Sequence, residues 1–148
     1  MERTLVVIKP DGIQHNLQEE IKKRLTATGL QIIAQKDMQV DAAFALEHYS
    51  DLGERKGADI QNKMVQMMSS GPVEALVVEG DNAIAEVRRI VGATEPTSAD
   101  KGTIRGDLAN DSYANADAEG RAVYNLVHAS DAPETAAKEI AMWFPELG

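Results

Sequence analysis

Four short apolar runs, each about the length of a β-strand, constrain this fold more than any other feature of the sequence. Residues 4–8 form a continuous apolar run that stops at Lys9-Pro10-Asp11-Gly12, which is typical of a buried strand followed by a tight turn. Residues 30–40 alternate apolar and polar side chains except at Ile33, which predicts a longer strand with one wet face. Residues 73–79 and 125–128 are the other two expected strands.

Segments with helical spacing separate these runs. Residues 17–28 carry an apolar side chain at every fourth position and stop before Gly29, which predicts a helix. A helical hairpin is expected between Asp41 and Ser69. Without that hairpin the order is βαββαβ, which predicts an α/β (α+β) ferredoxin-like sandwich: a four-stranded antiparallel sheet with helices on one side and the hairpin inserted. A chain of 148 residues suits one domain, spanning residues 1–148.

Three aspartates are expected to cap helices. Asp41 stands before the first helix of the hairpin, and Asp81 stands before a helix that follows the third strand. Asp131 is followed by Pro133 and Glu134, a pattern that predicts a capping box at the start of the last helix.

The charge and the residues that are missing exclude several classes of protein. The formal charge is −9, from 24 acidic and 15 basic residues, which argues against a nucleic-acid binder or a protein that binds anionic membranes. The absence of cysteine excludes disulfides, a thiolate nucleophile and a cysteine zinc site. No apolar segment is long enough for a signal peptide or a membrane span, so we expect a cytoplasmic protein.

Residues 92–124 lose all periodicity, although residues 114–124 could form a short helix. Loops of this length inside a compact domain are usually functional or disordered. We expect this one to be functional, because it lies between a helix and the strand that carries His128.

His128 is the candidate nucleophile, at the end of a strand and near the positive end of the last helix. A satisfied structural histidine is the more common outcome for such a residue. Glu139 lies at the edge of the apolar face of the last helix, so its carboxylate either accepts a hydrogen bond from the His128 ring or extends to solvent. His15 and His48 are expected on the surface or on a helix face.

Phosphate, if this chain binds it, must be held by dispersed side chains, because no glycine-rich phosphate-binding motif is present. Each candidate also has an ordinary interpretation as a solvated charge or a turn residue. Residues 115–126 are faintly similar to a calcium loop, but Leu126 stands where a bidentate glutamate is required, so we expect no metal ligands among the side chains. The candidate phosphate ligands are Lys9, Arg88, Thr94, Thr103 and Arg105.

Taken together, these residues resemble the nucleoside diphosphate kinase family. The similarity covers nearly the whole chain, and its last two motifs are highly specific. The matching stretches stand in the family's order: Arg3-Thr4-Leu5-Val6-Val7-Ile8-Lys9-Pro10-Asp11-Gly12, His48-Tyr49, Ser70-Gly71-Pro72-Val73, Gly92-Ala93-Thr94, Gly102-Thr103-Ile104-Arg105-Gly106-Asp107 and Asn125-Leu126-Val127-His128-Ala129-Ser130-Asp131.

The resemblance implies reversible transfer of the γ-phosphoryl group from a nucleoside triphosphate to a nucleoside diphosphate, by a ping-pong route through a phosphohistidine on His128. It implies that Ser130 and Glu139 orient that histidine, and that Mg²⁺ arrives on the nucleotide. It also implies a homo-oligomer, with dimer, tetramer and hexamer all open. The positions that match the family's phosphate- and sugar-binding residues are Lys9, Tyr49, Arg88, Thr94, Arg105 and Asn125, and Lys9 is also counted with the catalytic set.

Two departures from the family pattern concern the nucleobase. The helical hairpin lacks the aromatic residue that commonly stacks on the base, so Ile60 or Met64 is the expected apolar wall. The segment between Asp107 and Asn125 is longer than usual, and we expect it to fold as a short helix over the nucleotide or against a neighbouring subunit.

Two other functions remain compatible with the sequence, since a fold alone does not specify an activity. One is a non-catalytic nucleotide-binding or regulatory module. The other is a phosphohistidine carrier that passes its phosphoryl group to another protein.

Overall fold

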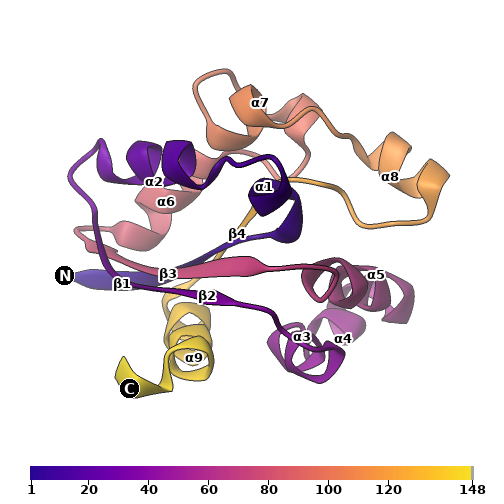
Figure 1. Ribbon diagram of the computed structural model, residues 1–148, viewed down its shortest axis with the longest axis horizontal. Coiled ribbons are helices and arrows are strands. Elements are labelled where there is room, and N and C mark those ends of the chain that lie inside the picture. Colours follow the sequence, from indigo (N-terminus) through magenta and orange to yellow (C-terminus); the bar gives the residue numbers. More distant parts are fainter. Residues whose placement is uncertain (148) are drawn as a thin grey trace.

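The computed structural model describes residues 1–147 and contains one four-stranded sheet (Figure 1). The strands are β1 (Glu2–Ile8), β2 (Gln31–Met38), β3 (Val73–Gly80) and β4 (Val127–Ala129). Their order is β2-β3-β1-β4 and every neighbouring pair is antiparallel, with Val6 opposite Leu76 and Val7 opposite His128. The predicted four-stranded antiparallel α+β fold is therefore confirmed.

Helices cover both faces of the sheet, whereas the sequence suggested helices on one side only (Figure 1). The helices α2 (Gln18–Thr26) and α6 (Ala83–Val91) lie on one face, where they pack on Val6 and Ile8 of β1. The opposite face, with Leu5 and Val7, is covered by α9 (Pro133–Trp143) and by the inserted helices α3 (Ala42–His48), α4 (Leu52–Lys56) and α5 (Ala58–Met68). Successive side chains of β1 point to opposite faces of the sheet, so this one strand contributes buried residues to both cores.

A β-bulge at Ile33 explains the break in the alternation of the second strand. Ile32 lies opposite Val78 and packs in the core with α2 and α6, but Ala34 lies opposite Val77 and packs in the other core. The extra residue leaves Ile33 exposed and turns the rest of the strand over.

One of the three predicted aspartate caps is present. The Asp41 carboxylate accepts a hydrogen bond from the Phe44 backbone N–H, as expected. The helix α6 instead begins after Asn82, and the carboxylate of Glu2 accepts from the Ile84 N–H at 2.9 Å, so the Asp81 prediction is wrong. Ala132 is the N-cap of α9 and Pro133 is its first residue, so the capping box at Asp131 and Glu134 is absent.

The aperiodic segment between Gly92 and Asn125 contains three short helices. They are a 3-10 helix (Pro96–Ser98), α7 (Ile104–Leu108) and α8 (Tyr113–Glu119). The Ser112 hydroxyl caps α8, and Arg121 binds the Asp111 carboxylate through both terminal nitrogens, at 2.6 and 3.2 Å. The remaining elements of residues 1–147 are α1 (Pro10–Gln14) and a 3-10 helix (Pro145–Leu147). Among these residues, no helix combines the length and the apolar character that crossing a bilayer requires.

Candidate active site

The alternation of side chains along β4 decides where His128 points. Val127 and Ala129 face the core formed with α2 and α6, so His128 between them faces the opposite side, where α9 and α3 lie. The His128 Nε2 atom lies 2.9 Å from Glu139 Oε1, and the Ser130 hydroxyl donates to the same oxygen at 2.6 Å. Because Nε2 is engaged by a carboxylate, the neutral ring carries its proton there and Nδ1 keeps the free lone pair.

Glu139 is a buried carboxylate, with 7% of its surface exposed. Burial alone would raise its pKa, but the hydrogen bond and charge of His128 and the hydrogen bond from Ser130 bring the pKa below its ordinary value. The carboxylate is therefore ionised at neutral pH. The alternative of a glutamate that extends to solvent is wrong.

The backbone just before His128 is strained. Leu126 has φ 74°, a left-handed value that is rare for a branched residue, and the Val127 N–H donates to the Asn125 carbonyl across it in a γ-turn. The Asp11 carboxylate accepts from the Leu126 N–H at 3.0 Å. Arg105 donates to the carbonyls of Asn125 and Val127, at 3.1 and 2.7 Å. The turn persists because these buried groups fix it on both sides.

Two buried cations lie beside this turn. The Lys9 ammonium donates to the Asn125 side-chain oxygen at 2.9 Å, and the Asn125 amide donates to the Thr94 carbonyl. Burial and the charge of Arg105 lower the pKa of Lys9 to about 7. Burial and the charge of Arg88 lower the pKa of Arg105 to about 10, so Arg105 stays charged at neutral pH. Two like charges held this close favour an anion as a ligand.

The Tyr49 hydroxyl is buried and has no hydrogen-bond partner among the described residues. Burial raises the pKa of Tyr49, so the phenol stays protonated and can donate to an incoming anion.

These side chains line one cavity of about 240 Å³. Ser130 is fully buried behind Glu139 and does not reach this cavity. Met64 lines it, but Ile60 does not and is 43% exposed. Thr103 also lies outside, where its hydroxyl caps α7, so its interpretation as a turn residue was the right one. The other predicted residues all line the cavity: Lys9, Tyr49, Arg88, Thr94, Arg105, Asn125, His128 and Glu139.

Several lining residues were missed from the sequence. His48 was expected on the surface or on a helix face, with no role in the site. Its side chain is instead fully buried, and its ring packs edge-on against that of His128, with 4.5 Å between centroids. The available signal was its position three residues after the buried Ala45 on the same helix face. Asp51, Leu52, Arg55 and Thr135 also line the cavity and carried no recognisable pattern. Asp131 lines it as well, although the sequence predicted it only as a helix cap within the last motif.

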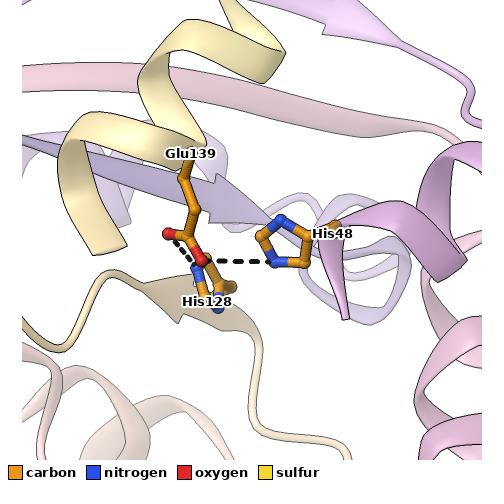
Figure 2. A group of neighbouring side chains, drawn as sticks. All are labelled: His48, His128 and Glu139. Atoms are coloured by element: carbon orange, nitrogen blue, oxygen red, sulfur yellow. Dashed lines mark hydrogen bonds and ion pairs between the residues drawn. The ribbon is translucent and has the colours of Figure 1, made fainter. Parts of the chain in front are cut away.

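His48, His128 and Glu139 form a group whose ligand atoms lie within 4.8 Å of one another (Figure 2). Of the four ring nitrogens of the two histidines, only His128 Nδ1 keeps a free lone pair. The Trp143 indole N–H donates to His48 Nδ1 at 3.0 Å, so His48 carries its hydrogen on Nε2. His128 Nε2 is bound to Glu139. The three residues therefore fit a hydrogen-bonded group better than a metal centre.

The long segment before β4 does not cover this cavity, since none of residues 108–124 lines it. Asn110, Asp111, Arg121 and Tyr124 instead line a separate cavity of about 310 Å³ with α1 and the end of α5. The part of the expectation that placed this segment over the nucleotide is thus not supported.

Comparisons with known proteins match nearly the whole chain. The sequence profile described as nucleoside diphosphate kinase matches residues 2–147. A nucleoside diphosphate kinase of Symbiobacterium thermophilum is 43% identical over 147 residues, which cover 99% of this chain and 89% of that protein. Nucleoside diphosphate kinase 1 of Mesembryanthemum crystallinum is 44% identical over 146 residues, with coverages of 99% and 90%.

Solved structures are also similar over nearly the whole chain. A transition-state mimic of the Borrelia burgdorferi nucleoside-diphosphate kinase, with bound vanadate and ADP, has a TM-score of 0.94 and 37% identity. The match covers 97% of this chain and 86% of that one. An NDP kinase of Pyrobaculum aerophilum has a TM-score of 0.87 and 36% identity, with coverages of 97% and 95%.

Proposed function

This chain belongs to the nucleoside diphosphate kinase family and is a phosphotransferase, and from that premise we propose that His128 carries the transferred phosphoryl group. The observation that supports this role most strongly is the bond between His128 Nε2 and Glu139, because it leaves the Nδ1 lone pair for attack.

In the first half-reaction, the Nδ1 lone pair attacks the γ-phosphorus of a nucleoside triphosphate. The bond from that phosphorus to the β-phosphate oxygen breaks, and the nucleoside diphosphate leaves with the electron pair. In the second half-reaction, a terminal phosphate oxygen of another nucleoside diphosphate attacks the same phosphorus and the N–P bond breaks. The proton on Nε2 stays in its bond to Glu139 throughout, so the ring does not turn.

The cations act on the charge that spreads over the transferred oxygens. Arg105 uses three of its N–H groups on backbone carbonyls, including that of Gly92, and a guanidinium has five donors, so two remain for phosphate. Lys9 and the Tyr49 hydroxyl add two more donors, both buried. Arg88, an exposed residue of α6, lies at the cavity edge and donates to the Ala129 carbonyl at 3.3 Å.

Mg²⁺ is proposed to enter as part of the nucleotide, where it neutralises charge on the phosphates. The side chains fit this arrangement, since the cavity offers the carboxylates of Asp51 and Asp131 but no closed cage of oxygen ligands.

A labelling experiment tests the role of His128. The protein is incubated with γ-labelled ATP, isolated, and then mixed with GDP. We expect label on the protein that moves to GDP, and His128→Ala should abolish the labelling while His15→Ala, an exposed histidine outside this cavity, keeps it. Protein that never takes up label would indicate a non-catalytic binder, and label that stays despite GDP would indicate a phosphohistidine carrier.

We further propose a homo-oligomer in which residues 108–124 contact a neighbouring subunit, because this segment lies away from the nucleotide cavity. Light scattering of the intact protein and of a variant that lacks the segment would measure its effect. Unchanged mass together with unchanged nucleotide affinity would contradict a role for the segment. Cytoplasmic location stays a prediction, which cell fractionation can check.

A further inference from the structure

Behind the His128–Glu139 pair lies a second histidine that the proposed reaction does not use. His48 is the last residue of α3, and its fully buried ring contacts the rings of Tyr49 and Trp143 edge-on as well as that of His128. A buried imidazole in contact with a nucleophile can affect the reaction through its packing, its protonation state and its hydrogen bonds.

Trp143 fixes the protonation state of His48. The indole N–H is a donor only, and it points at His48 Nδ1 from 3.0 Å, so this nitrogen must hold a lone pair. Trp143 is 1% exposed and packs edge-on against Phe44, with 4.8 Å between centroids, so the indole has little freedom to turn away. His48 is therefore neutral, and its single hydrogen is on Nε2.

That Nε2–H is directed at Glu139. Nε2 lies 3.9 Å from Glu139 Oε2 and has no hydrogen-bond partner among the described residues. The bonds from His128 and Ser130 both end on the other oxygen, Oε1. Figure 2 shows the carboxylate joined to both rings by dashed lines. A contact of 3.9 Å is too long for a hydrogen bond, so the two atoms must approach by about 1 Å to form one.

We propose that His48 is a positioning residue for phosphoryl transfer: Trp143 holds it as the Nε2–H tautomer, and this N–H anchors Glu139 Oε2 while Glu139 Oε1 orients His128. The proposal rests on the proposed role of His128. A neutral donor on Glu139 Oε2 keeps the carboxylate ionised. It thereby prevents Glu139 from taking the Nε2 proton of His128 as positive charge develops on the His128 ring. Closure of the contact also satisfies a buried donor, which is otherwise unfavourable.

The groups around His48 agree with a neutral ring. Burial and the charge of His128 lower its pKa to about 3, against the opposite effect of Glu139. The other titratable groups that face it come from several elements: Lys9, Tyr49, Lys138, and, around an adjoining cavity, Glu47, Asp51 and Glu134. The Trp143 bond favours the neutral Nε2–H form by geometry alone.

NMR on the intact, nucleotide-free protein tests the first step. Long-range ¹H–¹⁵N spectra of histidine-labelled protein should give His48 the Nε2–H pattern, unchanged between pH 5.5 and 8.5. In Trp143→Phe, His48 should titrate in this range or adopt the Nδ1–H form. A wild-type His48 that is cationic or protonated on Nδ1 would overturn the proposal, and this result does not depend on whether His128 is phosphorylated.

Kinetics test the second step. His48→Gln keeps one acceptor and one donor, whereas His48→Leu keeps neither. We expect kcat of the Leu variant to fall about tenfold with little change in KM, and the Gln variant to recover part of that loss. Equal kcat values in the two variants, or an effect on KM alone, would refute the donor role. Failure of wild-type labelling would instead refute the proposed function of His128.

Discussion

Replacing Ser130 with alanine is expected to destabilise the protein by an amount that depends on pH. The Ser130 hydroxyl is fully buried, donates to Glu139 Oε1 at 2.6 Å and accepts from the Leu5 backbone N–H at 3.3 Å. A hydrogen bond to a charged group contributes about 1.5–3 kcal/mol and a neutral one about 1 kcal/mol. Ser130→Ala should therefore lower the free energy of unfolding by about 2.5–4 kcal/mol at pH 7.

The pH dependence follows from the ionisation of Glu139. Its pKa lies below the ordinary value because the bonds and charges of its partners outweigh its burial. Such a carboxylate stabilises the fold above its unfolded pKa, and this stabilisation is lost as the pH falls through its folded pKa. In acid below the folded pKa of Glu139 both bonds of Ser130 are neutral, so the destabilisation by Ser130→Ala should shrink to about 2 kcal/mol.

Urea unfolding, followed by the fluorescence of Trp143, measures this difference at pH 7 and in acid. The protein concentration must be fixed, because assembly contributes to apparent stability. Ser98→Ala is a matched control: the Ser98 hydroxyl also donates to a carboxylate, that of Glu95, at 2.6 Å, but on the surface. Its effect should stay within about 0.5 kcal/mol. The reasoning would be refuted if Ser130→Ala lowered the free energy of unfolding by no more than Ser98→Ala does, or by the same amount at both pH values.

Three further predictions concern the cavity and the segment beside it. Because the pKa of Lys9 is lowered to about 7, nucleotide affinity should fall as the pH rises above 7, by at most about tenfold per pH unit. In calorimetric titrations, Lys9→Met should bind nucleotide weakly and with an affinity that does not change with pH. An equally steep pH profile in this variant would exclude Lys9 as the cause of the pH dependence. Met64→Phe should tighten ADP binding about 2–10-fold by stacking on the base, whereas Ile60→Phe, outside the cavity, should leave ADP binding unchanged. Equal effects of the two substitutions would refute the assignment of Met64 as the apolar wall for the base. Arg121→Met removes the bidentate bond that holds the pKa of Asp111 at about 2. Amide hydrogen exchange across residues 111–124 should become faster in this variant, while labelling of His128 is kept. Loss of labelling would mean that the segment supports the site.

The sequence determined the order of the elements and most of the phosphate end of the site. Continuous apolar runs and helical spacing predicted βαββαβ, since these periodicities follow from the geometry of strands and helices. Lys9, Arg105 and Asn125 could be predicted as ligands, because the motifs that carry them are local in the chain.

Only the tertiary structure decided how distant residues meet. The cap of α6 comes from Glu2, which lies 82 residues away along the chain, so the local aspartate pattern gave the wrong answer. His48 was expected on the surface or on a helix face, because nothing in its neighbourhood along the chain shows that it will meet Trp143 and Glu139. The side of the sheet that His128 faces also depends on pairing with β1, since a shift of one residue would turn the ring into the other core. Local periodicity specifies each element, whereas the burial and protonation of a side chain depend on neighbours that only packing brings together.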